Sequence, residues 1–380
     1  MAGLPGPLGA VLLAALAAPA EQLPPRTVEA VNTALARARD SLSIPGLTAA
    51  VAVGGEMVFA RGLGLADLEN AVPARAETVY RIASLAKPIT ATAVLQLAER
   101  GRLDLDAPVQ QYVPAFLEKP AGPDRGRARW RVTPRLLLAH QGGLRHVAAA
   151  EWSSTRHYAS LGEALESFKD DPLAYEPGSR CQYSTYGYNL LGSVVEGAAG
   201  RAYLDYVREE VFEPAGMTAT RLDDVLALIP NRARGYVRSA SGEIANAILA
   251  DTSNKIPGGG LASTAPDMAR FGAALLSGRL LKPETFHAML EPQQTRDRKR
   301  TAYGLGFRVG AWKGRPEAWQ HGGQPQVSTL LYLRPGQGVA VAILCNLEGV
   351  APALLDLARE IAGLLPAPPP AILTPPGKGR

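Results

Sequence analysis

The chain contains 380 residues, of which 47% are hydrophobic and 20% are charged, and its formal net charge is +5 at pH 7. This composition excludes an intrinsically disordered protein, and the length is sufficient for two structural lobes around a large core. Two short runs rich in basic residues, 125–131 and 296–300, do not belong to a recognisable nucleic-acid-binding module, so no nucleic-acid partner is predicted.

The N-terminus has the features of a signal peptide, which is predicted to cover residues 1–20. Residues 8–18 are apolar, and Ala18 and Ala20 provide small side chains for cleavage before Glu21. The apolar stretch is short for a transmembrane helix. We therefore expect a protein exported to the periplasm or secreted, with an N-terminal membrane anchor as the alternative. Membrane contact is expected only through an uncleaved N-terminus.

The first part of the chain after this segment predicts a helix, a hairpin and a second helix. Residues 27–42 have the apolar periodicity of a helix. Residues 47–53 and 56–62 are two strand-like runs joined by a two-glycine turn, which is typical of a hairpin. A short strand, 78–82, then leads into a helix over residues 89–100.

The middle of the chain is richer in helical patterns and loops. Further helices are expected over residues 134–139, 164–168, 188–199 and 205–212. Three consecutive glycines at 258–260 predict a tight turn, after which residues 265–277 again have helical periodicity.

The last part of the chain predicts mainly strands. Four consecutive strands are expected over residues 303–310, 318–321, 327–333 and 339–346. Nearly every residue of the last one is β-branched or apolar, as in a strand buried on both faces. A closing helix is expected over residues 352–365, and the proline-rich tail, 366–380, is expected to be disordered.

Strands at both ends of the chain and helices between them predict an α+β fold. We expect an antiparallel sheet flanked by N- and C-terminal helices, with a large helical insertion. The sheet lobe is predicted to be discontinuous, over residues 26–100 and 258–365, and the mainly helical lobe to cover residues 101–257. A cleft between the two is the natural place for a site.

Ser84 and Lys87 are the strongest candidates for chemistry. Three residues apart on the first turn of a helix, they lie on the same face, which brings the amine beside the hydroxyl. A partly desolvated lysine can lose its proton near neutral pH and accept the proton of the serine. The helix N-terminus adds N–H groups suited to negative charge. The same spacing also arises by chance, as an N-cap serine followed by a surface lysine.

Two later segments carry further candidates. Tyr183 stands just before a predicted helix, and a tyrosine beside two cations can have its pKa lowered well below about 10 and act as a base. The alternative is an aromatic packing residue. His321, Gly322 and Gly323 end a predicted strand, where paired glycines allow a ligand to approach the backbone. The alternative there is a strand-end turn with a satisfied histidine.

A backbone N–H near the paired glycines, together with the N–H of Ser84, could form an oxyanion hole. Residues 140–144 instead read as a helix end followed by glycines, and we expect them to be structural. The two cysteines, Cys181 and Cys345, are too few for a disulfide framework and lack metal-ligand spacing, so buried free thiols are expected.

Taken together, residues 84–87, 183–185 and 321–323 resemble the serine β-lactamase and penicillin-binding-protein superfamily in order and spacing. The chain looks most like the class C β-lactamase-related branch, and within it like the mitochondrial β-lactamase-like serine protease and its bacterial relatives. The resemblance covers residues 27–362 and includes the glycine-rich segment 251–260.

This resemblance implies roles for individual residues. Ser84 would be the nucleophile that forms an acyl-enzyme, Lys87 would help to deprotonate it, and Tyr183 would be the general base. His321 would stand where many relatives carry the lysine of a Lys-Thr-Gly motif, and Gln324 would donate the second oxyanion N–H.

Two departures from the family pattern bear on the substrate. Thr185 replaces the asparagine usual two residues after the tyrosine, and His321 is a weaker, pH-dependent cation than lysine. Both changes disfavour penicillin hydrolysis and favour another acyl substrate, a peptide or an ester. Self-association is also conceivable, because the mitochondrial relative self-associates.

The resemblance therefore predicts a serine hydrolase that cleaves an amide or ester without a metal or organic cofactor. The alternative from another class is a non-catalytic scaffold or ligand sensor of the penicillin-binding type. An α/β-hydrolase is disfavoured because no Gly-x-Ser-x-Gly occurs in the chain, and a metallohydrolase because no His-Glu-x-x-His does.

Overall fold

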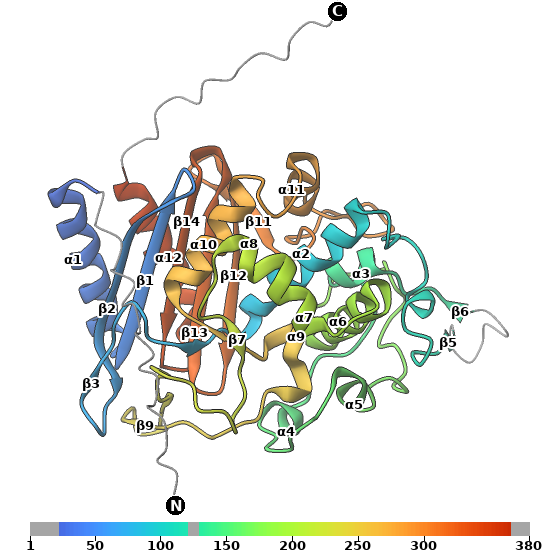
Figure 1. The fold of residues 1–380 in the computed structure, drawn as a ribbon, viewed down its shortest axis with the longest axis horizontal. Coiled ribbons are helices and arrows are strands. Elements are labelled where there is room, and N and C mark those ends of the chain that lie inside the picture. The colour runs from blue at the N-terminus through green and yellow to red at the C-terminus, as the bar shows by residue number, and fades with distance from the viewer. Residues whose placement is uncertain (1–22, 121–128, 366–380) are drawn as a thin grey trace, which may run out of the picture.

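The computed structural model describes residues 23–120 and 129–365 (Figure 1). The predicted signal peptide at 1–20, the predicted tail at 366–380 and most of the first basic run lie outside the described residues. Within the described ranges, no helix has both the length and the apolar character that a membrane crossing requires.

A seven-stranded antiparallel sheet forms the centre of the molecule, in the order β11-β12-β13-β14-β1-β2-β3. Strands from both ends of the chain meet where β1 pairs with β14, with Leu47 opposite Cys345. The strands are β1 (Gly46–Val53), β2 (Glu56–Asp67), β3 (Val72–Pro73), β11 (Arg308–Trp312), β12 (Arg315–Gln324), β13 (Val327–Arg334) and β14 (Val339–Cys345). The predicted fold class is confirmed.

The two faces of the sheet belong to different cores, because side chains alternate along a strand. In β1, Leu47, Ala49 and Val51 pack with α1 (Pro25–Ser41) and α12 (Ala351–Leu364). Ala50 and Ala52 point the other way, into the larger core that includes α10 (Ala265–Leu276). Figure 1 shows α1 at the outer side of the sheet and the helical part of the molecule on the other side.

The helices of the inner side centre on three elements: α2 (Ala86–Glu99), α6 (Thr185–Ala199) and α9 (Ile256–Gly259), which pack on one another. The other elements are β4 (Tyr80–Arg81), η1 (Ala83–Leu85), η2 (Val109–Gln111), β5 (Lys119–Pro120), β6 (Arg129–Trp130), α3 (Pro134–Leu138), α4 (Ala149–Trp152), α5 (Leu161–Leu165), α7 (Tyr203–Val207), η4 (Arg208–Phe212), α8 (Glu213–Ala215), β7 (Arg221–Leu222), β8 (Tyr236–Arg238), β9 (Ile244–Asn246), η5 (Ser253–Lys255), β10 (Leu261–Ser263), α11 (Pro283–Leu290) and η6 (Pro335–Gln337).

Two local predictions were wrong. The strand expected from residue 303 begins only at Arg308, because Gly306 has a φ of +118°, which no strand residue adopts. The glycines expected to form a tight turn instead end the short helix α9, and Gly258 allows it to approach α6: a Cβ there would lie 2.7 Å from Thr185 Cγ2. This contact positions the α9 backbone beside the site described next.

Candidate active site

Ser84 lies in a tight turn that neighbouring strands hold in place. The N–H of Ile82 donates to the carbonyl of Leu261 in β10 at 2.9 Å, and its carbonyl accepts the hydroxyl of Thr329 in β13 at 2.9 Å. Ala83 has a φ of +49°, a costly conformation for a residue other than glycine. Such strained residues cluster at functional sites, and this one directly precedes the serine.

The amine of Lys87 lies beside the hydroxyl of Ser84, with Nζ and Oγ 3.1 Å apart. The other two partners of Nζ are the Thr185 hydroxyl at 3.2 Å and the carbonyl oxygen of Gly258 at 2.6 Å. The Lys87 side chain is fully buried within α2. All three of these partners are uncharged, so none of them supplies the negative charge that would hold a proton on the amine.

The surroundings of Lys87 favour its neutral form. Burial is the largest cause that lowers the pKa of Lys87 well below its usual value, and the positive charge of Lys255 is the second. No carboxylate of the described residues offsets these two effects. A neutral amine at hydrogen-bond distance from Ser84 Oγ can accept the proton of that hydroxyl.

Tyr183 lies at the same place, but its predicted low pKa is wrong. Lys87 Nζ is 4.8 Å from the centre of the Tyr183 ring, and Gln320 Nε2 donates to the phenol oxygen at 3.4 Å. Burial is the largest influence on the pKa of the phenol and raises it, outweighing the hydrogen bond to Ser84, which lowers it. The effect of desolvation on the phenol pKa is therefore larger than the effect of nearby positive charge. The phenol keeps its proton at neutral pH and can act as a proton donor.

Two histidines fix the start of α6, directly after Tyr183. His140 Nδ1 accepts the N–H of Ser184 at 3.2 Å, and His146 Nδ1 accepts the N–H of Thr185 at 3.2 Å. Burial lowers the pKa of His140 well below its usual value and the pKa of His146 to about 4, so both rings are neutral acceptors. Orphan N–H groups at a helix start need such partners.

Both histidines act on the geometry of the site. The rings of His140 and Tyr183 are 4.4 Å apart, so the segment expected to be structural forms a wall of the site. His146 was missed by the sequence analysis. The only signal for it was its position six residues after His140, in the loop that follows the glycines.

The register of β12 corrects the role expected for His321. Gln320 points to Tyr183, and its neighbour His321 must then point to the opposite face of the sheet, because side chains alternate. Burial lowers the pKa of His321 to about 4, and the positive charges of Arg308 and of Arg359 in α12 act in the same direction. His321 is therefore neutral and turned away from Ser84. A shift of one residue places Gln320 where the cation was expected.

The same register points to Gly323 rather than Gln324 as the oxyanion donor of β12. A two-residue turn joins Gln324 to Val327, and residues that flank such a turn form a hydrogen-bonded pair, so the Gln324 N–H is directed at β13. N–H groups of adjacent strand residues point to opposite edges, so the N–H of Gly323 points away from β13, to the other edge of β12. Among the described residues, β11 ends opposite Trp319, which leaves that edge without a strand partner.

Gly322 explains how β12 comes so close to the nucleophile. A Cβ on Gly322 would lie 2.0 Å from the Thr329 hydroxyl and 2.6 Å from the carbonyl oxygen of Ile82. Only glycine permits this approach without a shift of the backbone. By contrast, a Cβ on the exposed Gly323 would meet no atom within 4 Å.

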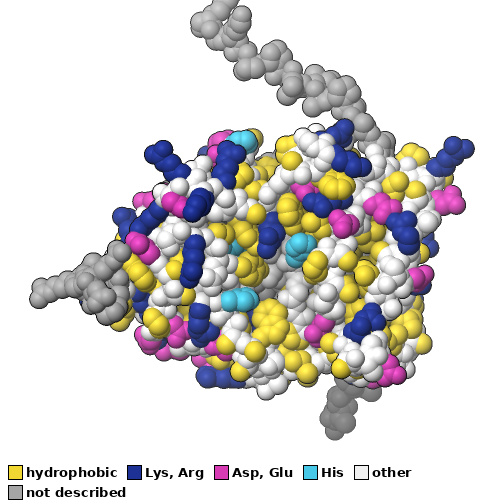
Figure 2. Space-filling view, turned by 180° about the vertical axis from the view of Figure 1, so that it is seen from behind, with side chains coloured by type: hydrophobic (Ala, Val, Ile, Leu, Met, Phe, Trp, Pro, Cys, Tyr) yellow, Lys and Arg dark blue, Asp and Glu magenta, His cyan; other side chains and the backbone are white. Residues whose placement is uncertain are grey.

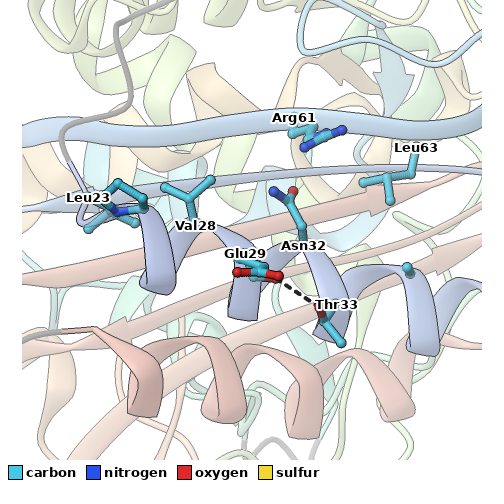
Figure 3. Close-up of a pocket in the computed structure, with 9 residues that line it drawn as sticks. Leu23, Val28, Glu29, Asn32, Thr33, Arg61 and Leu63 are labelled. Carbon is cyan, nitrogen blue, oxygen red and sulfur yellow. Dashed lines mark hydrogen bonds between the residues drawn. The ribbon is translucent and has the colours of Figure 1, made fainter.

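One face of the molecule is hollowed near its middle, and hydrophobic and histidine side chains border the hollow (Figure 2). A separate groove of about 590 Å³ lies between α1 and β2 (Figure 3), lined by Leu23, Val28, Asn32, Arg61 and Leu63 among others. It lies on the α1 side of the sheet and contains none of the predicted site residues.

The described residues contain no group of three histidine, cysteine, aspartate or glutamate side chains arranged to hold a metal ion. Both cysteines have free thiols; Cys345 is buried and Cys181 is half-buried. Burial raises the pKa of Cys345 to about 12 and is also the main cause that raises the pKa of Cys181, so neither is an activated nucleophile.

Comparisons with known proteins identify the family. Residues 31–365 match the family described as Beta-lactamase. The chain is 31% identical over 428 residues to the serine beta-lactamase-like protein LACTB, mitochondrial, of Homo sapiens, covering 86% of this chain and 77% of that protein. It is 38% identical over 184 residues to esterase EstB of Burkholderia gladioli, covering 45% of each protein.

A solved structure shows the same fold. The crystal structure of penicillin binding protein from Bacillus halodurans is similar with a TM-score of 0.71 and 26% sequence identity. The match covers 87% of this chain and 99% of that chain. The similarity therefore extends over nearly all of the described residues and includes both the sheet and the helical part.

Proposed function

Because the chain belongs to the beta-lactamase family, we propose that it is a serine hydrolase that cleaves an ester or amide through an acyl-enzyme on Ser84. The observation that carries this proposal is the buried Lys87 amine, without a carboxylate partner, 3.1 Å from the serine oxygen. A buried lysine with a purely structural role would be expected to have a charged partner.

Acylation begins when Ser84 Oγ attacks the carbonyl carbon of the substrate and its proton passes to the neutral amine of Lys87. The carbonyl oxygen becomes negatively charged. The backbone N–H groups of Ser84 and Gly323 are the donors assigned to it, and such preorganised donors stabilise the transition state more than the ground state.

Collapse of this intermediate breaks the bond to the leaving group, which needs a proton. The phenol of Tyr183 holds its proton at neutral pH, and the Ser84 side chain is close enough to act on its pKa, so the phenol can donate to the leaving group. The proton on Lys87 then replaces the one that the phenol gave up. Deacylation reverses these transfers, with water in place of the serine hydroxyl.

The residues beside Tyr183 bear on the substrate class. Gln320 is neutral and donates a hydrogen bond to the phenol, and His321 is neutral and faces the other way. β12 thus offers no positive charge in the place where a lysine would attract a carboxylate such as that of penicillins. The cation that acts on the phenol is Arg308, at the start of β11. Thr185 also lacks an amide for an acylamino group. We propose that esters and peptides are preferred over penicillins.

Covalent labelling tests the proposal. The purified protein is incubated with a fluorescent fluorophosphonate and, separately, with a fluorescent penicillin, and the intact mass is read. We expect a fluorophosphonate adduct on the wild type and none on Ser84→Ala. On Lys87→Met we expect no adduct at short labelling times. No adduct from either probe would favour a non-catalytic scaffold or ligand sensor instead.

A further inference from the structure

A second buried lysine, Lys255, lies next to the site and has no part in the proposed reaction. Its side chain is 1% exposed, and its amine donates to Asn254 Oδ1 at 3.1 Å and lies 5.5 Å from the centre of the Trp152 ring. Within the described ranges, no carboxylate forms an ion pair with it at 4.0 Å or less. Burying a cation in this way is costly and calls for an explanation.

Lys255 and Lys87 are both linked to the short helix α9, one through the chain and the other through a hydrogen bond. Lys255 directly precedes α9, and the carbonyl of Gly258, three residues later, accepts the amine of Lys87 at 2.6 Å. Helix α6 holds both partners in place. Its Thr185 accepts from Lys87, and one turn further on Asn189 donates to the carbonyl of Asn254 at 2.8 Å.

The charges that face the two lysines differ. Asp223 and Asp251 act on Lys255 and favour its protonated form, whereas burial and Arg81 disfavour it; the resulting pKa is about 8. Lys255 is therefore mostly protonated at pH 7.

The tyrosines and histidines around Lys87 are neutral. The positive charge of Arg308 acts on Tyr183 and His140 but is not among the causes that shift the pKa of Lys87. The rings of Tyr183 and Tyr188 lie 4.8 and 5.7 Å from its amine, and burial raises the pKa of both phenols. Burial lowers the pKa of both His140 and His146, so these histidines carry no charge near pH 7.

We propose that Lys255 is a positioning residue for the proposed reaction: its positive charge keeps the Lys87 amine unprotonated and so able to accept the Ser84 proton. Two ammonium groups that share one water-poor region repel each other, and the one with nearby carboxylates keeps its proton. Among the residues that the structure describes, Lys255 has such carboxylates and Lys87 has none. A neighbouring cation is a known way to activate a lysine.

The pH dependence of Ser84 acylation distinguishes this role from simple packing. The single-turnover rate of fluorophosphonate labelling is measured from pH 5 to 10 for the wild type, Lys255→Met and Lys255→Arg. For Lys255→Met we expect the acid limb of the profile to move up by about one pH unit, which is a tenfold lower rate at pH 6. At high pH the rate should return to the wild-type value. Lys255→Arg should keep the wild-type limb.

A matched control is Lys119→Met. Lys119 is also a buried lysine over an aromatic ring, 4.8 Å from the centre of Phe116, and burial lowers its pKa as well. Within the described part of the chain, Lys119 makes no hydrogen bond to Ser84 or Lys87, so its pH profile should match that of the wild type. If Lys255→Met does not fold, Lys255→Gln, which can still bond to Asn254, replaces it with the same expected shift.

Two outcomes would overturn the proposal. An acid limb that does not move in Lys255→Met would mean that its charge does not reach Lys87. An equal loss of rate at every pH would assign Lys255 a packing role only. Because the proposal rests on the proposed function, the wild type is checked first: absence of any Ser84 adduct would reject the function, and the role of Lys255 with it, before any variant is measured.

Discussion

The two faces of the central sheet bury ionisable side chains in different ways. On the α12 face, the buried Glu317 accepts from Arg359 at 2.5 Å, and this hydrogen bond raises the pKa of the guanidinium. On the helical face, Lys87 is buried with only neutral partners, and its pKa is lowered. The ion pair keeps Glu317 and Arg359 charged, whereas Lys87, which has no such partner, is held in its uncharged form. The first arrangement stabilises the fold, and the second leaves an uncharged amine beside the Ser84 hydroxyl.

The largest expected effect comes from removing the unpaired lysine. Lys87→Met should lower the rate of Ser84 acylation by about 10²- to 10⁴-fold, because general base assistance is lost. It should leave the free energy of unfolding unchanged or raise it, since a buried polar amine is replaced by an apolar side chain of similar length. Stopped-flow labelling and urea unfolding measure the two quantities. A large loss of stability would show that the lysine is structural.

The opposite result is expected on the other face. Arg359→Met leaves Glu317 buried without its partner, which should cost about 3 kcal/mol of unfolding free energy. The acylation rate of the folded fraction should stay within about twofold of the wild type, because the pair lies across the sheet from Ser84. The same two measurements apply. If the acylation rate fell as far as in Lys87→Met, the two faces would not be independent.

Two adjacent glycines sharpen the comparison within one strand. Gly322→Ala places a Cβ 2.0 Å from the Thr329 hydroxyl, so β12 must move away from the turn that holds Ser84. We expect about a hundredfold loss of acylation, in line with the sensitivity of catalysis to misplacement by about 1 Å. Gly323→Ala, which meets no atom within 4 Å, is the control and should retain most of the activity. Equal losses in both variants would contradict the proposed geometry.

The smallest expected effect is the pH dependence of stability from His146. Its folded pKa of about 4 is below the unfolded value of about 6.5, so folding favours the neutral ring. This contribution is fully present above pH 6.5 and is lost as the pH falls toward 4. In His146→Gln, the decrease in unfolding free energy between pH 7 and 4.5 should be smaller than in the wild type. An identical decrease would mean that the ring is not held neutral.

Much of the fold could be predicted from the sequence. Period-two alternation and glycine turns gave the hairpin of β1 and β2, and the order of strands and helices gave the sheet class. The start of β11 could not be predicted, because the residues before it are apolar and strand-like and only the φ of Gly306 sets them apart. The local pattern of apolar and polar residues does not show which glycine adopts a positive φ.

The site could be predicted only in part. The spacing of Ser84 and Lys87 places them on one face of a helix wherever that helix forms, and this contact was confirmed. The direction of the Tyr183 pKa was wrong, since desolvation depends on the whole fold and not on neighbours in the sequence. The sequence analysis named His321 and did not consider Gln320, because only a structure shows which residues of a strand face the site. Lys255 was missed for the same reason, since nothing in its local sequence reports burial.

The most direct test of the account is the pH dependence of Ser84 acylation in the wild-type protein, followed by single-turnover labelling and intact mass. If Lys87 is neutral because it is buried without a carboxylate, the rate should reach its plateau near neutral pH and fall as acid protonates the amine. A rate that instead rises about tenfold per pH unit up to about pH 10, as expected for an ordinary lysine, would contradict it.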